Sequence, residues 1–320
     1  MTNYRLIICL MLLSLFSNYT ANSQGNLGIV APFLPDVFSR FPVVRDLTMT
    51  ADGSEVYFTA QSPLSEISSI VCMKKKMGKW LEPELTNFSS GYQDMEPFIS
   101  HDGKKLYFVS NRPLDQTTKA DKDFDIWLVE RKDVESEWTA PVNLGLPVNS
   151  KENEFYPSVA ISGNLYFTCD GPNSKGKDDI FISKFINGNY AIPVSVGDAI
   201  NTEGYEFNAF VAPDESFLLF TCYNRKDGFG SGDLYISFSS SPASWSEPLN
   251  LGPEINSPQM DYCPFMAGNT DFLYFTSKRN TIQPISTTNP SMNDLLHELN
   301  KYDNGSSRIY IITNHSFIKK

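Results

Sequence analysis

A repeated unit is clearest in the sequence Glu96-Pro97-Phe98-Ile99-Ser100-His101-Asp102-Gly103-Lys104-Lys105-Leu106-Tyr107-Phe108-Val109-Ser110-Asn111-Arg112. An acidic residue and a short apolar strand come first, followed by a tight turn and an aromatic strand. Five strands of the latter type carry Tyr-Phe or its equivalent, at Tyr57-Phe58, Tyr107-Phe108, Tyr166-Phe167, Leu219-Phe220 and Tyr274-Phe275. Units of β type that recur about every 50 to 60 residues predict the blades of an all-β propeller.

Each repeat is expected to supply four strands. The third follows a polar, Gly-rich loop and begins with Asp-Ile or Asp-Leu, and the fourth follows an aromatic residue three positions before a proline, as in Trp138 and Pro141. An Asn-Ser or Asn-Thr pair often comes next. Proline suits the outermost strand of a blade because it lacks the N–H that an inner strand would use.

The ends of the chain indicate how the ring closes. The fifth repeat stops after its third strand, Ile309–Ile312, and a candidate fourth strand stands before the first repeat, around Pro35–Ser39. We therefore predict one propeller of five blades, with six as the alternative, whose N-terminal strand closes the last blade. The predicted blades span residues 45–91, 92–150, 151–202, 203–257 and 258–320, the last closed by residues 31–41. A helical pattern at Asn293–Tyr302 predicts a loop insertion whose leucines pack on the propeller.

Residues 1–23 have the features of a signal peptide. Arg5 precedes an apolar run, Leu6–Phe16, that is too short to span a bilayer, and small residues follow. Cleavage is expected near Ser23/Gln24, which predicts a secreted or periplasmic protein with no transmembrane span in the mature chain. The formal net charge of -11 argues against nucleic acid as a partner.

Four cysteines remain after the predicted cleavage. Cys169 and Cys222 occupy the same position in adjacent repeats, directly after the aromatic strand. There a cysteine is expected to act as a small buried apolar side chain, although the secretion signal leaves a Cys169–Cys222 disulfide open as the alternative.

The repeat resembles the TolB-like, or Pro-Asp-type (WD-like), β-propeller repeat of secreted and periplasmic bacterial proteins. The resemblance rests on Glu96–Arg112, on Pro213-Asp214-Glu215-Ser216 and on Gly230-Ser231-Gly232-Asp233-Leu234-Tyr235-Ile236-Ser237, and it covers nearly all of residues 30–313. Blades one and five depart from the pattern, with Ala51 at the start of one turn and Gly268-Asn269-Thr270 at the other. The resemblance implies a binding or scaffolding role and supplies no catalytic motif.

The acidic residues that open the repeats form the candidate binding set, namely Asp46, Glu96, Glu154, Glu206 and Asp261. Equivalent positions in a propeller surround its axis, where five carboxylates would attract a hard cation such as Ca²⁺. The alternative is that each acid pairs with a nearby donor, the candidates being the recurring Arg112, Arg225 and Arg279. No other cofactor and no catalytic residue is predicted.

These features favour a non-enzymatic propeller that serves as a scaffold of the cell envelope and binds a protein or glycan partner. None of the three histidines stands in a nucleophile–base pattern. One alternative is a glycoside hydrolase or lyase-type enzyme that uses axial carboxylates, since such enzymes need a pair of Asp or Glu side chains. The other is a structural module stabilised by a cation.

Overall fold

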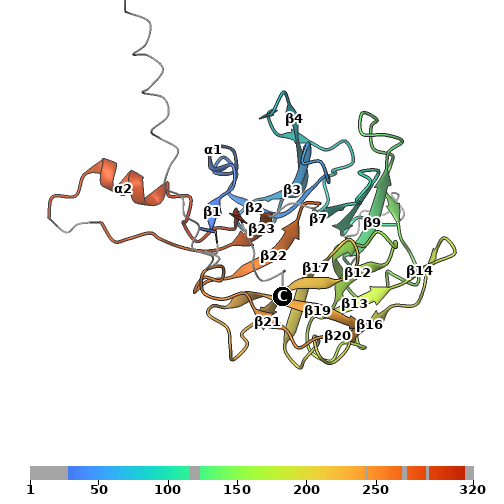
Figure 1. Ribbon diagram of the computed structural model, residues 1–320. Coiled ribbons are helices and arrows are strands. Elements are labelled where there is room, and N and C mark those ends of the chain that lie inside the picture. Colours follow the sequence, from blue (N-terminus) through green and yellow to red (C-terminus); the bar gives the residue numbers. More distant parts are fainter. Residues whose placement is uncertain (1–27, 115–122, 242–243, 269–271, 286–287, 314–320) are drawn as a thin grey trace, which may run out of the picture.

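The computed structural model describes residues 28–114, 123–241, 244–268, 272–285 and 288–313, and the expected signal peptide and its cleavage site lie outside these ranges. Five antiparallel blades surround a central axis (Figure 1), which confirms the predicted five-bladed all-β propeller. No helix within the described ranges is long and apolar enough to cross a membrane.

Each blade has four main strands. Blade one comprises β2 (Val43–Met49), β3 (Glu55–Gln61), β4 (Ser68–Lys76) and β6 (Glu84–Leu85). Blade two comprises β7 (Asp94–Ile99), β8 (Lys105–Ser110), β9 (Asp125–Glu130) and β10 (Val142–Asn143). Blade three comprises β11 (Glu154–Val159), β12 (Leu165–Cys169), β13 (Asp179–Ser183) and β16 (Val194–Ser195). Blade four comprises β17 (Tyr205–Val211), β18 (Phe217–Tyr223), β19 (Gly232–Ser241) and β21 (Leu249–Asn250).

Blade five comprises β22 (Asp261–Met266), β23 (Phe272–Ser277), β24 (Arg308–Thr313) and β1 (Ala31–Pro32). Four short strands lie outside these ladders or at their ends: β5 (Lys79–Trp80), β14 (Phe185–Ile186), β15 (Asn189–Tyr190) and β20 (Ser244–Trp245). The innermost strands are largely buried because neighbouring blades cover both of their faces. All six residues of β7 and all six of β22, for example, are buried.

The ring closes between the two ends of the chain, as predicted. Strand β1 pairs antiparallel with β24, with Ala31 opposite Ile311, and the Phe33 N–H donates to the Ile309 carbonyl at 3.0 Å. The segment expected to form this strand is instead the short helix α1 (Pro35–Phe38), which begins with a proline. Phe38 is fully buried and its ring lies 4.9 Å from that of Phe58, so α1 anchors the closing strand.

The predicted insertion between β23 and β24 contains the helix α2 (Met292–Leu299), which projects away from the blades at the left of Figure 1. A capping box between Ser291 and Asp294 starts this helix. Leu296 and Leu299 are 46% and 56% exposed, so the expectation that they pack on the propeller was wrong. The helical spacing was correctly recognised, but a long loop separates the helix from the core.

A recurring asparagine after the outermost strand completes three blades. Asn149 accepts the Ile126 N–H at 3.0 Å and donates to the Ile126 carbonyl at 2.9 Å. Asn201 makes the same pair of bonds to Ile180, and Asn256 makes them to Leu234. The amide thus acts as one more backbone unit of the sheet edge, which explains why the Asn-Ser or Asn-Thr pair recurs in the sequence.

Candidate functional site

The axis of the propeller is lined by one β-bulge from each innermost strand. The bulge residues have φ angles between 46° and 58°, and they are Asp46, Glu96, Tyr156, Asn208 and Cys263. Positive φ is uncommon for residues other than glycine, and bulges re-aim side chains next to functional sites. All five residues are buried, and their polar groups meet around the axis.

A hydroxyl of the preceding blade binds the backbone of several bulges. The Glu96 N–H donates to Thr59 Oγ1 at 3.0 Å, and Asn208 donates to Thr168 Oγ1 at 3.2 Å. Asp46 does the same across the closure, to Thr276 Oγ1 at 3.3 Å. These bonds fix each axial residue relative to its neighbour.

Blade two departs from this scheme. Val109 stands where the other blades have threonine. It lies opposite Met95 in blade two, just as Thr59 lies opposite Arg45 in blade one. The Tyr156 N–H therefore has no hydroxyl to bind, and it donates to Glu96 Oε2 at 2.7 Å instead. The departure draws one carboxylate of the set onto the axis.

Arg45 holds the two axial carboxylates together. Its Nε lies 2.7 Å from Asp46 Oδ2, and its Nη2 lies 2.7 Å from Glu96 Oε1. Asp46 also accepts a hydrogen bond from the Cys263 thiol at 2.7 Å. The side chains of Asp46 and Glu96 are 0% and 5% exposed, whereas that of Arg45 is 20% exposed and separates them from solvent.

Burial raises the pKa of Glu96 to about 7, and the negative charge of Asp46 adds to the rise while Arg45 opposes it. A carboxyl group in such an environment holds its proton close to neutral pH. Glu96 is thus a carboxyl group with a raised pKa, and Asp46 is a carboxylate paired with the guanidinium of Arg45. Acid–base chemistry uses two carboxyl groups in different environments of this kind.

The predicted acidic set occupies two different positions, which corrects the assumption that its members are equivalent. Only Asp46 and Glu96 are bulge residues on the axis. Glu154, Glu206 and Asp261 lie two residues earlier in their strands, where blade two has Asp94. Side chains along a strand alternate with a period of two residues. The axial position and the position two residues before it therefore look alike in the sequence pattern.

The acids at the earlier position bind the loop that leads into their blade. Each accepts the backbone N–H and the hydroxyl of a Ser or Thr four residues before it, and the pairs are Ser90 with Asp94, Ser150 with Glu154, Thr202 with Glu206 and Ser257 with Asp261. Burial raises the pKa of Glu154 to about 7 despite these bonds.

The recurring arginines do not reach the axis. Arg112 forms an ion pair with Asp94 at 2.6 Å, and Arg279 forms one with Asp261 at 3.0 Å. Arg225 lies near Asp227, at 3.4 Å, and near the Cys222 sulfur. Cys169 and Cys222 are both free thiols.

Sequence reasoning overlooked Arg45, Tyr156, Asn208 and Cys263 as axial residues. A signal was available, since proline follows the bulge in three blades, at Pro97, Pro157 and Pro264. Alignment on that proline rather than on the nearest acid finds the axial position. Across the described part of the chain, no group of three or more His, Cys, Asp or Glu side chains is placed to hold a metal ion, so calcium binding stays a prediction.

The two ends of the axis differ. Phe98, Phe210 and Phe265 fill one end, where the rings of Phe210 and Phe265 lie 5.5 Å apart. The other end opens into a cavity of about 530 Å³ that is lined by Arg45 and Tyr262 and by the loops that enter β4 and β24. Phe155 and Phe207 occupy the same strand position as Arg45 in blades three and four.

No family model matches the chain, and no curated protein matches it. Among solved structures, it is similar to a glycoside hydrolase (9% identity, 91% of this chain and 92% of that chain, TM-score 0.57). It is also similar to the GH43 endo-arabinanase from Bacillus licheniformis (12% identity, 84% and 93%, TM-score 0.52). TolB from Acinetobacter baumannii matches at 12% identity and a TM-score of 0.48, and the match spans 91% of this chain but only 64% of the TolB chain.

At these identities the likeness establishes the fold of this chain. This comparison corrects the expectation of a non-enzymatic scaffold, because the similar structures are mostly glycoside hydrolases. The acids that open the repeats were expected at equivalent positions, and the structure divides them into an axial pair and a group bound to loops.

Proposed function

We propose that this protein is a glycan-cleaving enzyme of the glycoside hydrolase type, exported from the cytoplasm, with Glu96 and Asp46 as its carboxylate pair. The observation that carries the proposal is the meeting of these two side chains under Arg45, at the end of the axis that opens into a cavity. The remaining acids of the predicted set are engaged in loop contacts. The fold shared with glycoside hydrolases supports the same assignment.

The chemistry requires two carboxyl groups in different environments. Glu96, whose pKa is raised to about 7 by burial, donates its proton to the glycosidic oxygen as the bond to the anomeric carbon breaks. Asp46 provides the second carboxylate, as base toward water or as nucleophile. Addition of water then yields two sugars with free hydroxyl groups.

Access to the pair depends on Arg45. Its guanidinium contacts both carboxylates and stands between them and the cavity, so a saccharide reaches them only when that group swings aside. Hydroxyl groups of the sugar would replace the hydrogen bonds that are lost. The aromatic side chains of Phe155, Phe207 and Tyr262 surround this end of the axis and suit the apolar faces of sugar rings.

Hydrolysis of a panel of polysaccharides and aryl glycosides tests the proposal. For any substrate that is cleaved, Glu96→Gln and Asp46→Asn should each lower kcat/KM by at least about 100-fold, the usual contribution of acid–base catalysis. The rate should fall as pH rises through about 7, because Glu96 then loses its proton.

Glu203→Gln is the matched control, since it removes an exposed carboxylate that belongs neither to the axial set nor to the lining of the cavity. Cleavage by the wild type that survives both axial substitutions in folded protein would contradict the assignment of the pair. Absence of cleavage across the whole panel would contradict the enzymatic proposal itself.

A further inference from the structure

The cavity at the open end of the axis carries an excess of positive charge. Its described lining residues include Arg45, Lys278 and Arg308 and no acidic side chain. Lys278 is exposed and forms no ion pair with a described residue, and Arg45 is already neutralised by Asp46. The concentration of positive charge stands out because the whole chain has a net charge of -11.

Arg308 is the unusual member of this group. Among the described residues three arginines are buried, and the other two, Arg112 and Arg131, each pair with a carboxylate at 2.6 Å. Arg308 is 5% exposed and donates through Nη1 only to the backbone carbonyls of Pro42 and Ser307. Its Nε is buried and has no partner, and its Nη2 bonds to no described residue.

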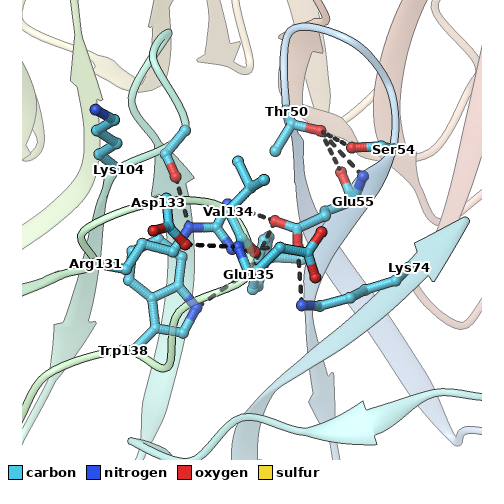
Figure 2. A network of polar contacts seen from close by, with 12 residues as sticks. Thr50, Ser54, Glu55, Lys74, Lys104, Arg131, Asp133, Val134, Glu135 and Trp138 are labelled. Atoms are coloured by element: carbon cyan, nitrogen blue, oxygen red, sulfur yellow. Dashed lines mark hydrogen bonds and ion pairs between the residues drawn. The ribbon is translucent and has the colours of Figure 1, made fainter.

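Arg131 shows what a satisfied buried arginine looks like in this protein. Figure 2 shows its guanidinium beside Glu55, and the two side chains make two hydrogen bonds, at 2.6 and 3.2 Å. Its Nε donates to the Gly103 carbonyl at 2.7 Å, and the guanidinium stacks over Trp138. Burial would lower the pKa of Arg131, but the hydrogen bond and charge of Glu55 raise it.

Arg308 has no carboxylate partner among the described residues, and although its guanidinium lies 5.8 Å from the centre of the Tyr302 ring, burial lowers its pKa. A buried charge without a counter-ion is costly. A guanidinium forms charge-assisted hydrogen bonds to carboxylate oxygens. The unpaired Nη2 of Arg308 therefore points to an anionic ligand in this cavity.

We propose that the cavity binds the carboxylate of an acidic sugar, so that the glycan recognised by this protein contains uronic acid residues. Arg308 receives the carboxylate through Nη2, and Lys278 adds a second positive charge at the rim. Since Arg45 lines the same cavity, a sugar held in this way has its neighbouring ring beside the axial pair. The inference rests on the proposed function for the identity of the ligand as a saccharide.

Titration calorimetry of the mature protein with trigalacturonic acid tests the proposal, with the methyl ester of the same trisaccharide as the neutral comparison. The acid should bind at least about tenfold more tightly than the ester, as expected for a charge-assisted hydrogen-bonded pair. Equal affinities would overturn the proposal. Inorganic phosphate is the second probe, and Arg308-dependent binding of phosphate tighter than that of the trisaccharide would also overturn it.

Two substitutions locate the site. Arg308→Gln should weaken binding of the acid by about tenfold or more and leave the affinity for the ester unchanged. Because Arg308 also binds the Pro42 carbonyl, Lys278→Glu serves as a variant that leaves the fold intact, and it should produce a loss in the same direction. Lys184→Glu, an equal charge change on an exposed residue of blade three, should have no effect, and wild-type affinity in Lys278→Glu would contradict the assignment.

The calorimetric measurement tests the uronic acid site, and it does so independently of whether the protein cleaves a glycan. Selective binding of the acid without cleavage of any glycan would support the uronic acid site and contradict the enzymatic proposal. Cleavage of neutral glycans with equal binding of acid and ester would support the enzyme and contradict the site.

Discussion

At the axial bulge, one backbone geometry holds five different side chains. The N–H of this position needs an acceptor, and three blades supply a threonine hydroxyl from the preceding blade. Where Val109 replaces the threonine, Glu96 becomes the acceptor, so a single apolar substitution on β8 explains the orientation of the carboxylate with the raised pKa. The chemistry of the site thus depends on residues that never face the cavity.

Removal of one of these hydroxyls should therefore be costly. Thr59→Val leaves the buried Glu96 N–H without an acceptor, which should lower the free energy of unfolding by about 1 to 3 kcal/mol. Chemical denaturation measures the loss. The control is Thr221→Val, because the buried Thr221 Oγ1 makes no hydrogen bond and its loss should cost less. Equal losses in the two variants would show that the hydroxyl does not support the bulge.

The raised pKa of Glu96 also predicts a pH dependence of stability. The folded-state pKa, about 7, lies above the unfolded value of 4.5, so the unfolded chain releases this proton first as pH rises. The contribution of Glu96 should accordingly decrease between pH 4.5 and 7, by up to about 1.4 kcal/mol per pH unit. The difference between wild type and Glu96→Gln isolates this effect, because Glu154 and Glu206 titrate in both. A difference that is constant with pH would contradict the raised pKa.

Strand β1 has only two residues, yet it closes the ring. It covers the edge of β24, and α1 behind it buries Phe38 against the first blade. Unpaired edges invite association with other chains. The two ends of the sequence are thereby joined in one sheet, although 275 or so residues separate them in the chain.

Deletion of residues 24–33 should lower the thermal midpoint by about 5 °C or more and promote self-association, because the edge of β24 is then exposed. Calorimetry and light scattering measure the two effects. Deletion of residues 24–28, which stops short of β1, is the control. A monomeric product of the longer deletion with an unchanged midpoint would show that β1 does not close the ring.

For the whole molecule, the five-bladed ring was predictable because each blade repeats the same aromatic strand and turn, and because the fifth repeat lacks its last strand. The position of the closing strand was missed by four residues, since Pro35 starts a helix instead. Only two of the five axial bulge residues were recognised, because the position two residues before the bulge also carries an acid, as Asp94 does before Glu96. Contacts across blades, such as those from Thr59 or Arg45, carry no local signal in a single sequence.

The difference between the two ends of the axis separates stability from recognition. Phe265 packs against Phe98 and Phe210 at the closed end, and Phe265→Ala should lower the free energy of unfolding by about 3 to 5 kcal/mol through the cavity it leaves. Affinity for trigalacturonic acid should stay within about twofold of wild type, because the cationic cavity lies at the other end. Phe272→Ala is the control, since Phe272 is 36% exposed and its loss should cost little. A loss of affinity in folded Phe265→Ala as large as that in Lys278→Glu would mean that the apolar end positions the axial residues, and the two ends would then have to be treated as one site.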